Sequence, residues 1–149
     1  MHIVINPIEE IETKYKNGDF FTGFALAVTY FEYQANLILS MFFQGRISRK
    51  ALERWSLALK IRLIFGLNLI EEKEVFHKIH DIIEMRNRLI HPTEQEDKEE
   101  RKGDTILRFR LNEEEKSLLL GFKECYSELV QTDFKVFKKR LGNGEPKSL

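Results

Sequence analysis

The chain has 149 residues, a length that suits one domain with its own hydrophobic core. Apolar residues make up 42% of the chain and charged residues 32%, which is typical of a globular protein. The 24 Lys and Arg residues are balanced by 24 Asp and Glu residues, so no global positive field attracts nucleic acid. Any contact with RNA or DNA is therefore expected from a local patch.

Cysteine content and hydropathy set further limits on the class of protein. The single cysteine, Cys125, excludes an intrachain disulfide and a thiolate zinc site, and it fits a reducing, cytoplasmic compartment. Residues 1–6 lack the basic start and long apolar run of a signal peptide. The most apolar stretch, 20–43, is interrupted at Glu32 before it reaches the roughly 20 apolar residues of a membrane span. We therefore expect a buried central helix there, with no membrane partner.

The first half of the chain predicts three helices. Pro7 suits the start of a first helix, which ends at Asn17-Gly18. Asp19 is placed to cap a second helix that runs to about Gln44-Gly45. Ser48 is placed to cap a third, which ends near residues 66–68. Apolar residues at intervals of four and three form a packing seam on the second helix: Phe24, Val28, Phe31, Ala35, Ile38 and Phe42. The third helix carries a similar seam: Leu52, Trp55, Leu59 and Leu63.

The second half predicts two more helices, over about 71–90 and 112–141. Pro92 disfavours helical geometry at His91 and ends the fourth helix there. The charged stretch 93–104 reads as a solvated loop, and the alternation over 106–111 suggests a short extended segment within 105–111. Asn112 and Glu115 form an N-cap pair at the start of the last helix, which 142–144 ends. The fold predicted is an all-α, antiparallel up-and-down bundle of about five helices over 1–142, with a disordered tail at 143–149.

One arginine breaks the pattern of the fourth helix. At about 100° per residue, Arg86 falls near the middle of one broad apolar arc. The arc comprises Val75, Phe76, Ile79, Ile82, Ile83, Leu89 and Ile90. Burying an arginine without a partner costs on the order of several kcal/mol, because the charged guanidinium is removed from water. Three interpretations are open: Arg86 pairs with a buried carboxylate such as Glu32, lies at a subunit interface, or binds a phosphate through its planar guanidinium.

A second, polar stripe lies beside this arc and includes Asn87 and His91, which are four residues apart. A helix C-terminus carries partial negative charge, which favours the protonated form of His91. Such a histidine can hold a proton near neutral pH and pass it to a leaving oxygen, or it can simply cap the last carbonyls. Because Arg86 and His91 are five residues apart, one helix does not place them on the same face.

The segment Arg86-Asn87-x-x-x-His91 resembles the R-x4-6-H motif of HEPN domains, whose arginine is usually followed by a polar residue. The order of an apolar central helix carrying Glu32 and a Leu/Ala-rich helix ending near Gly66 is also similar to that superfamily. It further resembles the mannitol-repressor-like branch, whose members are not established nucleases. In pattern the resemblance covers about residues 19–92.

The resemblance implies an HEPN-like bundle that cleaves RNA without a metal or other cofactor, as a toxin or defence nuclease with an antitoxin or regulatory partner. Two motifs would meet across a homodimer interface to form one composite site. His91 would act as general acid or base, and Arg86 would stabilise charge on the phosphoryl oxygens. Asn87 would orient either His91 or the phosphate. The alternatives are a non-catalytic interaction module or transcriptional regulator, and a nucleotide-sensing pocket.

Basic side chains around the third helix are the candidates for holding RNA. They are Arg46, Arg49, Lys50, Arg54, Lys60 and Arg62, to which Arg88 is added beside the motif; a second run comprises Lys135, Lys138, Lys139 and Arg140. Ordinary solvated helix faces are the favoured explanation for each run. His77 and His80 are three residues apart on one helix, but no further metal ligand is evident nearby, so no metal site is expected.

Overall fold

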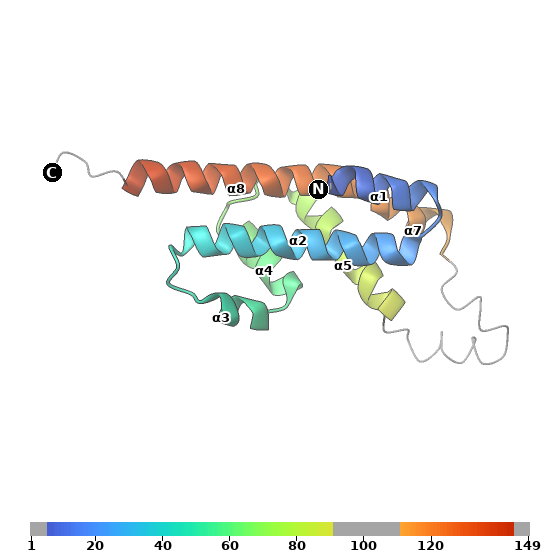
Figure 1. Cartoon of the computed structure of the whole chain (residues 1–149), viewed down its shortest axis with the longest axis horizontal. Coiled ribbons are helices and arrows are strands. Elements are labelled where there is room, and N and C mark those ends of the chain that lie inside the picture. The colour runs from blue at the N-terminus through green and yellow to red at the C-terminus, as the bar shows by residue number, and fades with distance from the viewer. Residues whose placement is uncertain (1–5, 91–110, 145–149) are drawn as a thin grey trace, which may run out of the picture.

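The computed structural model describes residues 6–90 and 111–144, with side chains described as far as residue 141 in the second range. Every regular element in this part of the chain is a helix, which confirms the predicted all-α bundle (Figure 1). The elements are α1 (Pro7–Lys16), α2 (Phe20–Phe42), α3 (Arg49–Arg54), α4 (Leu57–Gly66), α5 (Lys73–Ile90), α7 (Glu113–Ser117), the 3-10 helix η2 (Leu118–Gly121) and α8 (Phe122–Gly144). Of the described helices, none combines the length and hydropathy that crossing a membrane requires.

The long helices alternate in direction along the chain. In Figure 1, α2 and α8 run the same way, while α1 and α5 run the opposite way. Helix α2 is the centre of the bundle and packs against α1, α4, α5 and α8. Its inward face buries Phe24 and Phe31 completely, and Phe31 stacks on Phe122 of α8 with ring centroids 5.3 Å apart. Five of the six residues of its predicted seam are buried, and Phe42 at the end is exposed.

Helix α1 is fastened to the bundle by a polar contact. The Tyr30 hydroxyl donates a hydrogen bond to Glu10 of α1. Burial of the phenol, and then this bond to a carboxylate, raise the pKa of Tyr30 to about 12. Tyr30 therefore stays protonated at neutral pH and keeps α1 attached to α2.

The helix starts follow the capping chemistry read from the sequence, with one exception. Asn6 accepts hydrogen bonds from the Ile8 and Glu9 amides ahead of Pro7, and Ser48 accepts one from the Ala51 amide. Asp19 occupies the N-cap position of α2 but makes no side-chain cap. Its carboxylate lies 3.7 Å from the Lys14 ammonium instead, so an ion pair across the turn has replaced the cap.

The predicted third helix is divided into two, which corrects the sequence interpretation. Trp55 is extended, with φ −82° and ψ 141°, and Ser56 starts α4 by accepting a hydrogen bond from the Leu59 amide. The break changes which residues face inward. Leu59, expected in the seam, is 46% exposed, while Leu57, Lys60, Ile61 and Ile64 are buried. A serine that caps a helix start can interrupt a continuous apolar pattern, and the pattern alone does not reveal it.

The predicted last helix is also divided, into α7, η2 and α8, and α8 runs through Gly144 instead of ending before residue 142. The capping box at the start of α7 is complete, because Asn112 accepts from the Glu115 amide and Glu115 accepts from the Asn112 amide. Several predictions lie outside the described residues: the charged loop 93–104, the extended segment up to residue 110, and the tail from residue 145 onward.

Candidate functional site at the end of α5

Helix α5 is described as far as Ile90, and its inward face is buried along most of its length. The predicted end at His91-Pro92 lies outside the described residues. Val75, Ile79, Ile82, Ile83 and Leu89 are all at most 3% exposed. Leu89 lies with Phe20 and Phe21 around one cavity, so the end of α5 is next to the start of α2. In the last described turn Leu89 is buried, whereas Arg86, one turn earlier, is half-buried and Ile90 is 41% exposed. A second protein surface could pack there.

Arg86 makes no ion pair within the part of the chain that the structure describes. Its Nε is buried and has no hydrogen-bond partner among these residues. Glu32, the carboxylate considered as its partner, instead lies 3.8 Å from the Nζ of Lys60. The interpretation of Arg86 as the partner of Glu32 is therefore wrong, and the interface and phosphate interpretations remain.

Lys60 is a second inward-facing cation, and the sequence interpretation of it as a surface residue is wrong. Its side chain is 0% exposed, while that of Glu32 is 44% exposed. The Nζ is buried and has no hydrogen-bond partner in the described residues, although it lies near the Glu32 carboxylate. The helix break at Ser56 turns Lys60 inward, which removes it from the group of cations available to bind RNA.

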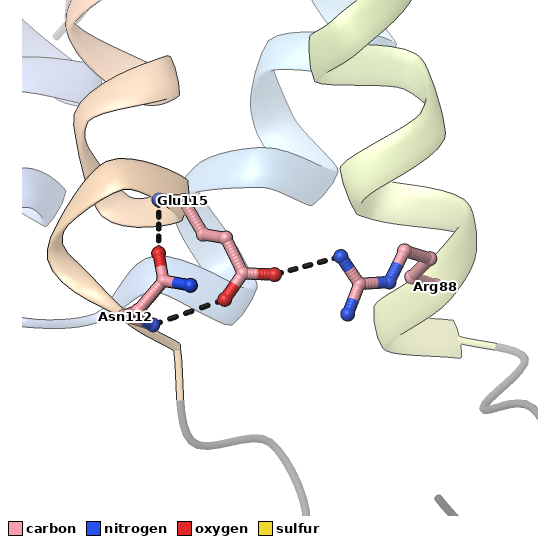
Figure 2. Close-up of polar contacts among 3 residues, drawn as sticks. All are labelled: Arg88, Asn112 and Glu115. Carbon is pink, nitrogen blue, oxygen red and sulfur yellow. Dashed lines mark hydrogen bonds and ion pairs between the residues drawn. The ribbon is translucent and has the colours of Figure 1, made fainter. Parts of the chain in front are cut away.

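Arg88, predicted to bind substrate, contacts a carboxylate of α7. Figure 2 shows its guanidinium pointing toward Glu115, with Nη1 2.7 Å from Oε2. The other oxygen of Glu115 accepts the Asn112 amide at 3.0 Å, and the Glu115 amide donates to Asn112 Oδ1 at 2.7 Å (Figure 2). The capping box of α7 is therefore attached to the last turn of α5. The sequence analysis identified Asn112 and Glu115 only as a cap and gave no signal for the contact with Arg88.

The surroundings of Arg88 are acidic. A cavity of about 250 Å³ beside it is lined by Asp81, Glu84, Met85, Arg88, Glu114, Glu115 and Leu118. Four carboxylates against one guanidinium oppose a phosphate on this side of α5. The uncovered turn at Arg86 and Ile90 belongs to a different face of the helix, because Arg88 is about 200° further round than Arg86.

The structure places the remaining motif residues only in part. Asn87 is exposed and lies about 100° round the helix from Arg86, so these two side chains do not converge within one protomer. His91 lies outside the described residues. Its position relative to Arg86 and its role as acid or base therefore stay predictions.

The other predicted RNA-binding cations are on the surface. Arg46, Arg49, Lys50, Arg54 and Arg62 are all exposed, around α3 and along α4. In the view of Figure 1, α3 and the end of α5 both lie below α2, whereas α8 lies above it. On α8, Lys135, Lys138, Lys139 and Arg140 are also exposed. The three lysines lie within about 100° of one another round the helix, and Arg140 lies about 100° beyond Lys139.

Two further side chains of reactive type, His80 and Cys125, pack against other parts of the bundle. His80 packs its ring edge-on against Phe76, with centroids 5.1 Å apart. Cys125 is buried on α8, and burial raises the pKa of its thiol to about 12, which keeps it from acting as a thiolate. Across residues 6–90 and 111–144, His, Cys, Asp and Glu form no group of three or more arranged to hold a metal ion.

Comparison of the chain with protein-family models, with curated proteins and with solved structures gives no match.

Proposed function

We propose that this protein is a metal-independent endoribonuclease of the HEPN type, with a composite site formed by Arg86, Asn87 and His91 of two subunits. The observation that carries the proposal is the state of Arg86. It lies half-buried in the last turns of α5, and it has no ion pair in the described residues, where Glu32 lies near Lys60. A guanidinium in this state is suited to bind an anion such as a phosphate.

A second subunit is part of the proposal for a geometric reason. Arg86 and Asn87 do not converge on one helix, and Ile90 leaves apolar surface exposed beside Arg86. Packing two α5 ends together would cover Ile90 and bring two copies of the motif to one place. The uncovered turn thus supports a homodimer in which each subunit completes the site of the other.

The reaction needs a proton acceptor, a proton donor and a group that stabilises the phosphoryl charge. A ribose 2′-hydroxyl would lose its proton to one His91 and attack the adjacent phosphorus. The bond from phosphorus to the 5′-oxygen would break, and the His91 of the other subunit would protonate that oxygen. Arg86 would stabilise the charge that develops on the non-bridging oxygens. The products would be a 2′,3′-cyclic phosphate and a 5′-hydroxyl.

The RNA would be held by the exposed cations around α3, namely Arg46, Arg49, Lys50 and Arg54. Arg88 contributes only where its contact with Glu115 opens. A nuclease of this kind requires control in the cell, so an antitoxin or other regulatory protein is the partner class that the proposal implies.

The test is cleavage of single-stranded and structured RNA in the presence of a chelator. His91→Ala is expected to lower the rate by about 10²–10⁴-fold, the usual contribution of an acid–base group. Arg86→Ala is expected to lower it by about 10²–10³-fold. His77→Ala, which removes an exposed histidine from the other end of α5, is the matched control and should cleave like the wild type. Wild-type rates in both motif variants would contradict the proposal.

The second candidate is a non-catalytic HEPN-like interaction module or regulator, and the exposed apolar surface at Ile90 favours it equally. In this case Arg86 stabilises an interface and nothing is cleaved. The two functions separate in one comparison. Wild-type protein that leaves RNA intact, together with an Arg86→Ala variant that melts earlier or has a lower mass, supports the module.

A further inference from the structure

Helix α8 exposes a line of large apolar side chains, here called the outer stripe: Val130, Phe134, Phe137 and Leu141. They are 39%, 59%, 45% and 54% exposed, respectively. Their spacings of four, three and four residues place them on one narrow line, about 120° round the helix from the buried Leu129 and Val136. The inward face of α8 thus packs against the bundle, while the outer stripe is exposed.

The spacing of the outer stripe is that of a two-helix seam. Alternating steps of three and four residues are the pattern by which one helix packs along another. The line is narrow, whereas a helix that lies in a membrane surface presents a broad apolar face flanked by cations. Here Asp133 stands at one edge of the stripe, and Lys135 and Lys139 point away from it. The edges therefore fit another helix better than an anionic lipid surface.

The charges beside the outer stripe are self-complementary. Asp133 and Arg140 lie on one edge, and Gln131 and Lys138 lie on the other. If two copies of α8 pack antiparallel, centred between Phe134 and Phe137, each Phe134 meets Phe137 of the second copy. The same arrangement places Asp133 of each copy beside Arg140 of the other, so two opposite-charge pairs form. A second copy of α8 therefore supplies the complementary charges for both pairs.

Asp133 gives independent support, because its carboxylate is incompletely satisfied in the single chain. Its Oδ1 is buried and has no hydrogen-bond partner among the described residues. Burial also raises the pKa of Asp133, so its charged form is destabilised in the single chain. An arginine brought beside it would offset that cost.

We propose that the outer stripe binds a second copy of this chain through an antiparallel contact between two α8 helices. This contact is distinct from the dimer proposed at the α5 end. Figure 1 shows the C-terminal half of α8 at one end of the molecule and the end of α5 toward the other. The two contacts can therefore form or fail separately.

The first test is the molar mass by light scattering or sedimentation, over low to high micromolar concentration. Phe134→Glu is expected to halve the mass seen for the wild type at high concentration. Leu59→Glu is the matched control, since Leu59 is a 46% exposed leucine on α4. Because Phe134 is remote from the motif, the variant should retain any RNA cleavage. Equal masses for wild type and Phe134→Glu at every concentration would overturn the contact.

The second test uses the charges, and it distinguishes an antiparallel contact from unspecific apolar association. Asp133→Arg and Arg140→Asp each place like charges together and should raise the dissociation constant by about tenfold or more. The double variant reverses both partners and should restore association. Lys135→Asp changes the charge of an exposed lysine away from the stripe and should have no effect. Single variants that associate as tightly as the wild type count against the proposal.

A third measurement addresses a membrane in place of a second copy. Wild-type protein is mixed with vesicles of phosphatidylglycerol and floated on a density gradient. The proposal predicts that the protein stays with the soluble fractions at the concentrations where it associates. Protein that is monomeric by mass, and that floats with the vesicles only when Phe134 is present, would replace the second copy by a lipid surface.

Discussion

Two cations turned toward the inside of the bundle have different surroundings. Lys60 is completely buried, and the Glu32 carboxylate is 3.8 Å from its ammonium. Moving an ammonium out of water costs on the order of several kcal/mol. Attraction to one half-exposed carboxylate at this distance does not recover that cost. Arg86 is half-buried and has no ion pair in the described residues. We therefore expect Lys60 to cost stability, and we propose that Arg86 meets a ligand or a second subunit.

The cost of Lys60 is measurable by substitution. Lys60→Met keeps the apolar length of the side chain and removes the buried charge, so the free energy of unfolding should rise by about 1 kcal/mol or more. Lys60→Ala removes the packing as well and should lower it. Urea denaturation followed by circular dichroism measures both, with Lys73→Met, an exposed lysine, as the control. A loss of stability in Lys60→Met as large as that in Lys60→Ala would show that the ion pair with Glu32 stabilises the fold.

At the scale of the elements, the end of α5 is positioned by α7. Glu115 serves two helices at once, because one oxygen caps α7 through the Asn112 amide and the other accepts from Arg88 of α5. The contact fixes the last turn of α5, which carries Arg86, beside the start of α7. The contact between Arg88 and Glu115 therefore joins the end of the first described range, 6–90, to the start of the second, 111–144.

Glu115→Ala should lower the free energy of unfolding by about 1 kcal/mol, because both the N-cap contact and the contact to Arg88 are lost. Glu114→Ala is the control, since it removes an exposed neighbour from the same first turn of α7. Thermal unfolding of the two variants measures the difference. Equal melting temperatures for Glu115→Ala and Glu114→Ala would mean that the contact in Figure 2 does not hold the end of α5.

Sequence pattern predicted those elements whose local signals agree with one another. The local signals predicted the start of α1 at Pro7, the period of α2 and the cap at Asn112. The break at Trp55 and Ser56 was not, because a serine within an apolar period gives no sign of whether it caps. The consequence was the wrong placement of Lys60. The contact from Arg88 to Glu115 joins residues 27 apart, and no local pattern specifies it.

At the scale of the molecule, two uncovered surfaces lie toward different ends of one bundle. The last turn of α5 presents Arg86 and Ile90, and the outer stripe of α8 presents four large apolar side chains. Each surface would be covered by a second copy of the chain, and both together would build an assembly larger than a dimer. Only the α5 surface carries the motif, so catalysis is expected to depend on that surface alone.

We propose that the α5 end cleaves RNA through the ribose 2′-hydroxyl. The most direct measurement compares one RNA oligonucleotide with its matched version carrying 2′-deoxyribose at the cleaved position, in chelator and with enzyme in excess. We expect cleavage of the RNA to a 2′,3′-cyclic phosphate end and no cleavage of the deoxy version. Cleavage of both at similar rates, or an RNA left intact by a folded, dimeric wild-type protein, would contradict the account.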